Sequence, residues 1–160
     1  MSAIDKFSNS VEKELAETCS LSTENINSFT VCGRTPSIVV SPNNHESVVR
    51  IVSLASELDL KILPCGGLTT SGVGYSPDSY DIALSTDKIS NVFDFLPNDL
   101  TAVVGPGMTV EKLNKLTNKE SQTSGFDPPF PALSTIGGVA MADKSGPMQL
   151  RWGRARDRFM

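Results

Sequence analysis

The sequence predicts an α+β fold that begins with a βαβ unit, and three stretches of the chain carry this prediction. Residues 37–41 (SIVVS) and 61–65 (KILPC) are short apolar runs of the kind found in strands. Between them, apolar residues recur at helical spacing from Val48 to Leu58, which predicts an amphipathic helix that ends near Asp59. A strand, a helix and a strand within about 30 residues imply a parallel pair of strands.

The elements that precede this helix are predicted from local signals. Residues 11–17 are expected to form a short polar helix, and the Ser-, Thr- and Asn-rich residues 20–30 a connector. Asn43, followed three residues later by Glu46, resembles a helix-capping pair. Residues 1–35 are therefore expected to be a helix and a connector that precede a domain over residues 36–160.

Further elements are expected towards the C-terminus. Residues 81–86 (DIALST) and 100–104 (LTAVV) read as two more strands, which gives a small parallel or mixed sheet and a second α+β lobe. Thr109 is placed to cap a helix over residues 110–118. Residues 127–131 (DPPFP) are expected to be rigid and extended.

Composition excludes several classes of function. The chain has 39% hydrophobic and 20% charged residues and a net charge of -4, which argues against a dedicated nucleic-acid binder. No run approaches the roughly 18 apolar residues of a membrane span, and the first residues lack the apolar core of a signal peptide, so a cytoplasmic location is expected. With three cysteines in no CxxC pair and one histidine, His45, neither a zinc site nor histidine-based nucleophilic catalysis is expected.

The densest chemical signal is a Gly-rich turn, residues 64–74, that directly follows a predicted strand. Glycines allow backbone N–H groups to converge on an anion, and Thr69, Thr70 and Ser71 add hydroxyl donors, so a diphosphate is the natural ligand. The turn lacks the Lys-Ser/Thr of a Walker A motif, and Gly74 and the residues after it do not open a helix as the Rossmann motif requires. A tight surface loop without a ligand remains the alternative.

Three more segments carry weaker signals. Residues 134–140 contain paired glycines, typical either of backbone packed against a flat group or of tight strand or helix packing. Residues 127–129 form a stiff turn that either walls a groove or connects two elements. The four arginines of residues 151–158 either meet a phosphate or a partner surface or form a solvated tail.

Taken in order, these segments resemble the FAD-binding domain of the vanillyl-alcohol oxidase (PCMH-type) flavoenzymes. The resemblance covers roughly residues 36–157 and is strongest to the FAD-binding subunit of bacterial glycolate oxidase. It implies that FAD is the cofactor and that the turn wraps its pyrophosphate, with Gly107 near the cofactor and two later segments lining the flavin and ribityl side. The implied cofactor-binding residues are Pro64, Cys65, Gly66, Gly67, Leu68, Thr69, Thr70, Ser71, Gly72, Gly107, Asp127, Pro128, Pro129, Thr135, Ile136, Gly137 and Gly138.

The same resemblance implies how FAD is held and what the parent enzyme does. Leu68 stands where relatives with covalent flavin often carry a histidine, and no cysteine follows Gly138, so a non-covalent FAD is expected. The implied activity is that of a glycolate oxidase-like 2-hydroxy-acid oxidoreductase, with a second flavin subunit and an iron–sulfur subunit as partners. No catalytic residue is identified.

The family's remaining strands and its substrate-side domain would follow Met160. The second lobe is therefore expected to be incomplete, the domain truncated, and the chain inactive by itself. Two alternatives stay open: a cofactor- or partner-binding module without turnover, and a degenerate remnant whose exposed strand edge favours homo-oligomers.

Overall fold

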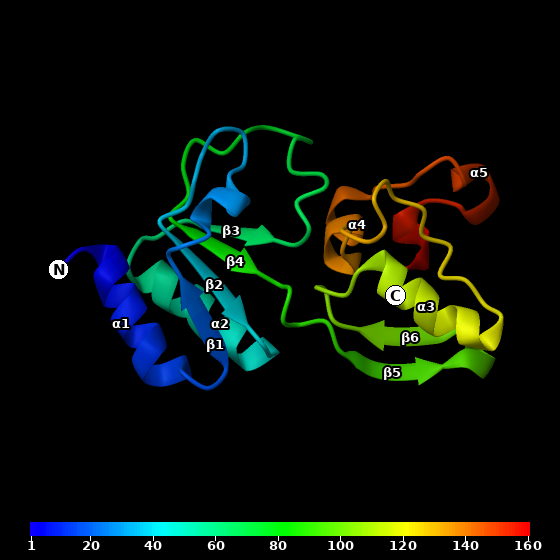
Figure 1. Ribbon diagram of the computed structural model, residues 1–160, viewed down its shortest axis with the longest axis horizontal. Helices are drawn as coiled ribbons and strands as arrows, with labels where there is room; N and C mark the ends of the chain where they lie inside the picture. Colours follow the sequence, from blue (N-terminus) through cyan, green and yellow to red (C-terminus); the bar gives the residue numbers. More distant parts are fainter. The chain divides into compact units, whose positions relative to one another are not determined.

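The computed structural model describes residues 1–160, which form two compact units (Figure 1). Unit 1 consists of Met1–Cys65 and Gly74–Lys88, and unit 2 of Gly66–Val73 and Ile89–Met160. A mixed sheet and a separate antiparallel sheet, each accompanied by helices, confirm the predicted α+β class.

The sheet of unit 1 has four strands in the order β1-β2-β4-β3. Their bounds are Cys19–Ser22 (β1), Ile38–Pro42 (β2), Ile62–Cys65 (β3) and Ile82–Ser85 (β4). Strands β2 and β3 are parallel, as expected, and each pairs with β4, which lies between them. All four residues of β4 are buried, and a strand that is buried on both faces is best placed between two parallel neighbours.

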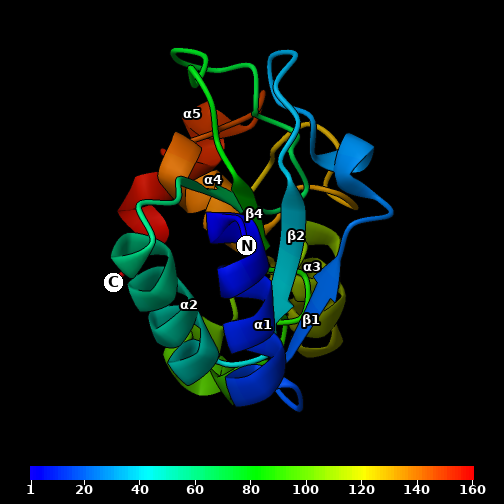
Figure 2. The same cartoon turned by 90° about the vertical axis from the view of Figure 1, so that its left-hand side faces the viewer.

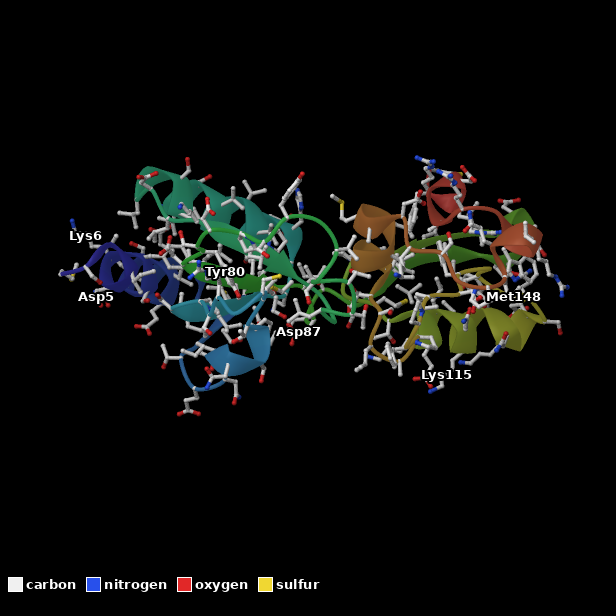
Figure 3. All side chains as sticks on the ribbon, turned by 90° about the horizontal axis from the view of Figure 1, so that it is seen from above. Asp5, Lys6, Tyr80, Asp87, Lys115 and Met148 are labelled. Atoms are coloured by element: carbon white, nitrogen blue, oxygen red, sulfur yellow. The ribbon has the colours of Figure 1, made fainter.

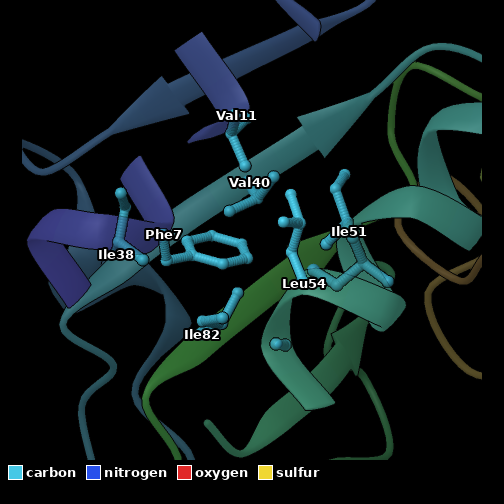
Figure 4. Close-up of a cluster of buried hydrophobic side chains, with 9 residues drawn as sticks. Phe7, Val11, Ile38, Val40, Ile51, Leu54 and Ile82 are labelled. Atoms are coloured by element: carbon cyan, nitrogen blue, oxygen red, sulfur yellow. The ribbon is translucent and has the colours of Figure 1, made fainter. Parts of the chain in front are cut away.

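Two helices cover one face of this sheet, as Figure 2 shows: α1 (Ala3–Leu15) and α2 (His45–Glu57). Alternate residues of β2 and β4 point towards these helices and close the core drawn in Figure 4. The buried residues of this core are Phe7, Val11, Ile38, Val40, Ile51, Leu54, Ala55, Ile82 and Leu84.

The N-terminal helix is longer than predicted and is not purely polar. Helix α1 begins after Ser2, whose hydroxyl accepts the Asp5 N–H while the Asp5 carboxylate accepts the Ser2 N–H. Phe7 and Val11 of this helix are buried to 1% exposure or less. The expected connector over residues 20–30 is also only partly right, because it contains most of β1 and the 3₁₀ turn η1 (Ile26–Phe29).

The N-cap of helix α2 lies one residue later than expected. The N-cap is Asn44, whose side-chain oxygen accepts the Ser47 N–H at 2.8 Å. The Asn43 N–H instead donates to the Thr18 carbonyl oxygen at 2.9 Å, so Asn43 still belongs to the β1–β2 pairing.

Tyr80, labelled in Figure 3, fastens the segment between β1 and β2 to the rest of unit 1. Its hydroxyl lies within hydrogen-bonding distance of the carbonyl oxygens of Phe29 and Arg34, and its side chain is 6% exposed. Residues 1–35 therefore share the core and hydrogen bonds of unit 1.

Unit 2 consists of a two-stranded antiparallel sheet, three α-helices and connecting turns. The strands and the turn between them are β5 (Val92–Leu96), η2 (Pro97–Asp99) and β6 (Thr101–Val104). The helical segments after them are α3 (Val110–Thr117), η3 (Asn118–Glu120), α4 (Ile136–Ala142), α5 (Gln149–Trp152) and η4 (Ala155–Arg158). The core of this unit comprises Met108, Val110, Leu113, Ile136, Val139 and Ala155.

The predictions for unit 2 are partly confirmed. Strand β6 and the Thr109 cap of α3 are present, and the Thr109 hydroxyl accepts the Lys112 N–H at 3.3 Å. Residues 127–131 are not extended throughout: the chain reverses at Phe130, whose φ is +56°, and its carbonyl oxygen accepts the N–H groups of Leu133 and Ser134. Among all 160 residues, no helix is long and apolar enough to cross a membrane.

Candidate cofactor site

The Gly-rich turn leaves the end of β3 and continues into unit 2. The chain bends at Gly66 and Gly67 and forms a turn over residues 69–72. The Ser71 N–H donates to the Leu68 carbonyl oxygen at 3.3 Å, and Leu68 itself has a φ of +54°. Of the predicted pyrophosphate residues, Pro64 and Cys65 end β3 and belong to unit 1, whereas Gly66 to Gly72 belong to unit 2.

Gly66 and Gly67 are required because the turn packs directly against another segment of unit 2. A Cβ on Gly66 would lie 2.2 Å from the Thr135 Oγ1, and a Cβ on Gly67 would lie 1.8 Å from the Leu133 carbonyl oxygen. Real Cβ atoms do not approach other atoms this closely, so any side chain would push the turn away. The two glycines thus bring the Gly-rich turn into close contact with the segment that carries the paired glycines.

A chain of hydrogen bonds joins these segments to the proline-rich one. The Ser134 hydroxyl lies 3.0 Å from the Thr69 hydroxyl and 2.7 Å from the Pro129 carbonyl oxygen. A carbonyl can only accept, so Ser134 donates its single hydroxyl hydrogen to Pro129 and accepts from Thr69. Ser134 is 2% exposed and was not among the predicted cofactor residues, although it directly precedes one of them, Thr135.

This arrangement corrects the expected number of hydroxyl donors in the turn. Thr69 donates to Ser134, and the Ser71 hydroxyl donates to the Leu68 carbonyl oxygen at 2.9 Å. Of the three hydroxyls expected to meet an anion, only that of Thr70 makes no hydrogen bond within the protein. The sequence could not show this, because both internal acceptors depend on how the chain folds back.

Most of the hydrogen-bond donors that the turn offers to a ligand are backbone N–H groups. None of the N–H groups of Gly66, Gly67, Leu68, Thr69 and Thr70 donates to a protein acceptor. The five residues are half-buried or exposed, so water or a ligand can satisfy these N–H groups. Half-exposed donors next to the Thr70 hydroxyl suit an anion with many oxygen atoms, so the residues present fit the diphosphate of FAD.

The start of α4 offers an anion no such donors. Thr135 caps the helix, and the N–H groups of Ile136, Gly137 and Gly138 donate to Met108 O, Pro106 O and Thr135 Oγ1, respectively. A Cβ on Gly137 would lie 2.9 Å from the Pro106 Cβ. Gly137 therefore serves tight packing of the helix, one of the two roles the sequence allowed, and these three N–H groups have no hydrogen left for a ligand.

Two further predicted residues, Gly107 and Asp127, already have partners within unit 2. The Gly107 N–H donates to the Ile89 carbonyl oxygen at 2.9 Å. One carboxylate oxygen of Asp127 accepts the N–H of Met148, labelled in Figure 3, at 2.9 Å. A Cβ on Gly146 would lie 1.8 Å from the Asp127 carbonyl oxygen, so Asp127 fixes the 145–148 loop.

The C-terminal arginines make ion pairs and ring contacts within this chain, although Arg151, Arg154 and Arg156 are exposed. Arg154 and Arg156 lie 4.0 and 3.3 Å from a carboxylate oxygen of Asp143. The guanidinium groups of Arg151 and Arg158 lie 4.6 and 5.8 Å from the Trp152 ring centroid, and Arg158 also donates to the Trp152 carbonyl oxygen. Within this chain, the four arginines act on protein groups.

No acid–base or nucleophilic group joins the turn. His45 is exposed at the first position of α2 in unit 1. Burial raises the pKa of the Cys65 thiol to about 11, so this thiol stays protonated and unreactive at neutral pH. The site is therefore equipped to hold a ligand, and no residue of the turn itself is suited to proton transfer.

Comparison with known proteins identifies the family. A family model described as FAD binding domain matches residues 36–160. The glycolate oxidase subunit GlcD of Bacillus subtilis strain 168 is 29% identical over 126 residues, which are 76% of this chain and 26% of GlcD. The alkyldihydroxyacetonephosphate synthase of Trypanosoma brucei brucei is 28% identical over 125 residues, 75% of this chain and 20% of that enzyme. The chain thus spans about a fifth to a quarter of these relatives.

Solved structures show the same fold. An alkyldihydroxyacetonephosphate synthase superposes with a TM-score of 0.80 at 21% identity and covers 96% of this chain and 32% of its own. A substrate-bound p-cresol methylhydroxylase gives a TM-score of 0.74 at 17% identity, covering 90% of this chain and 30% of its own. The family model covers most of the chain, and the fold and the donors of the turn agree with it. FAD is therefore the cofactor, and the chain belongs to the PCMH-type FAD-binding domain family.

Proposed function

We propose that the turn of residues 66–70 binds the pyrophosphate of FAD through its backbone N–H groups. The observation that supports this most directly is the run of five N–H groups without a protein acceptor, beside the one uncommitted hydroxyl, Thr70. A hydrogen bond to a charged group contributes roughly 1.5–3 kcal/mol, so a few such bonds suffice for specific binding. The net charge of the whole chain is -4, which makes local donors more important than overall attraction.

The remaining predicted residues are proposed to contact FAD without donating N–H groups to it. Gly107, the segment Asp127-Pro128-Pro129 and the segment Thr135–Gly138 would line the flavin and ribityl side through Cα and side-chain surfaces. A non-covalent FAD is part of this proposal. It is supported by Leu68 in the turn and by the protonated, buried thiol of Cys65.

For the parent activity we propose a glycolate oxidase-like oxidation of a 2-hydroxy acid. The support is that relatives of similar identity include GlcD, a D-lactate dehydrogenase of Archaeoglobus fulgidus (28% identical) and a D-2-hydroxyglutarate dehydrogenase of Stutzerimonas stutzeri (26% identical). Bound FAD would supply the hydride-accepting chemistry, and this chain would position it. A second flavin subunit and an iron–sulfur subunit are the proposed partners.

A second candidate is a cofactor- or partner-binding module without turnover. It is favoured by the composition of the turn, which offers donors for a ligand but no group for proton transfer. An assay of purified, FAD-loaded chain with glycolate or D-lactate and a dye acceptor tests this second candidate. We expect no turnover from this chain alone. Dye reduction above the protein-free rate would contradict that expectation.

The binding proposal is tested by flavin absorbance and by a charge placed in the turn. The purified chain, incubated with FAD and gel-filtered, is expected to keep the flavin absorption bands. Thr70→Asp and Thr70→Asn both remove the hydroxyl, but only the first adds a negative charge. We expect Thr70→Asp to weaken FAD binding at least about tenfold relative to Thr70→Asn. Equal affinities would show that the pyrophosphate lies elsewhere.

A further inference from the structure

We propose that Ser134 is a positioning residue for the phosphate-binding turn. Its hydroxyl holds Thr69 and thereby fixes the backbone of residues 66–70 in the shape that binds a diphosphate. This inference rests on the proposed function of the turn, and it gives Ser134 a role that does not require contact with FAD.

The direction of the hydrogen bonds makes Thr69 an anchor of the turn. Because Ser134 donates to the Pro129 carbonyl oxygen at 2.7 Å, its oxygen presents lone pairs to the Thr69 hydroxyl 3.0 Å away. Thr69 therefore directs its hydroxyl hydrogen to Ser134 and has none left for a phosphate. The contribution of Thr69 is to anchor the turn, and Ser134 sets where the anchor lies.

Ser134 is itself held in place by its neighbours in unit 2. Its carbonyl oxygen accepts the N–H of Val110, the first residue of α3, and its N–H donates to the Phe130 carbonyl oxygen, both at 2.9 Å. The backbone of Ser134 is thus held on both sides, and the residue is only 2% exposed. Because α3 and the turn at Phe130 hold Ser134 in place, the Ser134 hydroxyl in turn holds the Thr69 hydroxyl in place.

The turn needs such an anchor. The N–H groups that would bind the diphosphate make no hydrogen bonds inside the protein, so they do not order the turn themselves. The contacts of Gly66 and Gly67 with residues 133–135 limit how the turn packs, and the Thr69–Ser134 bond ties the fourth residue of the donor run to the same segment. A turn held in its binding shape before the ligand arrives loses less entropy on binding.

The test is a double-mutant cycle on the full chain with two ligands. FAD contains the diphosphate, whereas riboflavin contains the flavin ring without it. We expect Ser134→Ala and Thr69→Val each to weaken FAD binding about tenfold and to change riboflavin binding less than about twofold. The double variant should bind FAD no more weakly than either single variant, because both substitutions break the same bond. Thr69→Ser keeps the hydroxyl and should retain FAD affinity within about threefold.

Three results would overturn the inference. These are additive losses in the double variant, an equal loss for FAD and riboflavin, and unchanged FAD affinity in Thr69→Val. Denaturant unfolding identifies variants that fail to fold; if Ser134→Ala is one of them, the comparison of Thr69→Val with Thr69→Ser carries the test. Failure of the pyrophosphate proposal itself is recognised separately, by equal FAD affinities of Thr70→Asp and Thr70→Asn.

Discussion

Gly67 lies so close to Leu133 that a Cβ built on the glycine would come within 1.8 Å of the Leu133 carbonyl oxygen. The neighbour is backbone and not a flexible side chain, so it cannot move aside at low cost. We expect Gly67→Ala to lower the free energy of unfolding of unit 2 by about 1–3 kcal/mol or more and to displace the turn. Denaturant unfolding followed by the fluorescence of Trp152, the single tryptophan and a residue of unit 2, measures this loss.

Gly72 provides the matched control in the same turn. A Cβ on Gly72 would meet nothing within 4 Å, and its φ lies outside the left-handed region. Gly72→Ala should therefore leave stability unchanged or raise it by up to about 1 kcal/mol. If both glycine variants unfolded at the same denaturant concentration, the packing of the turn against Leu133 would be refuted.

The same pair of residues shows why the site was only partly predictable. A Gly-rich stretch after a strand is a local signal, and the sequence alone located the turn. The reason for Gly66 and Gly67 is contact with residues 133–135, which lie far along the chain and come close only through folding. The commitment of the Thr69 and Ser71 hydroxyls to internal acceptors was hidden for the same reason.

The fold divides along a similar line. Elements with strong local periodicity or a clear cap, such as β2, α2 and α3, were predicted to within a few residues. Strand β5 was missed because four of its five residues are exposed and a bulge between Val92 and Asp94 interrupts its pairing with β6, so no alternation of buried residues marks it. The central place of β4 in the sheet of unit 1 goes with its burial on both faces. A comparison of strands that are neighbours in the sequence does not reveal this burial.

Asp127 is expected to stabilise unit 2 whether or not FAD is present. Its carboxylate accepts the Met148 N–H at 2.9 Å beside Gly146. Asp127→Ala leaves that donor without its charged partner and should cost about 1–3 kcal/mol, whereas Asp127→Asn retains an acceptor oxygen and should cost less. Urea unfolding of the FAD-free variants distinguishes the two, and equal stability of Asp127→Ala and wild type would contradict this role.

Phe7 is expected to be essential for unit 1 although it lies outside the part of the chain that matches the family model. Its side chain is fully buried between α2 and the strands. Phe7→Ala should cost about 3–5 kcal/mol, as other large-to-small substitutions in cores do. The neighbouring Lys6, exposed on the outside of α1 and labelled in Figure 3, gives the control variant Lys6→Ala. A chain that tolerated both substitutions equally would show that α1 does not complete this core.

Alkaline pH should destabilise the chain through the thiols of Cys19 and Cys65. Burial raises the pKa of Cys19 and of Cys65 from 9.0 to about 11. Below pH 9 both thiols are protonated in the folded and unfolded states, so they make stability neither rise nor fall. Between pH 9 and about 11 the unfolded chain releases these protons first, and the free energy of unfolding should fall as pH rises. Urea unfolding from pH 8 to 11 should show a shallower decline in Cys65→Ala than in wild type; parallel curves would contradict the assignment.

The β5–β6 sheet is expected to mediate self-association, as proposed from the sequence for an exposed strand edge. Its apolar side chains include Phe93 and Val103, which are 63% and 55% exposed, and two-stranded sheets are rarely stable by themselves. Pairing with a second copy would cover these side chains and satisfy the free strand edge.

Sedimentation velocity should show wild-type chain associating as its concentration rises. Val103→Lys should shift that association to at least about tenfold higher concentration, because it introduces charge into an apolar contact. Lys115→Gln, a change on the exposed side of α3, serves as the control and should associate like wild type. A wild-type chain that remained monomeric at all concentrations, or a Val103→Lys variant that associated equally well, would exclude this sheet as the contact surface.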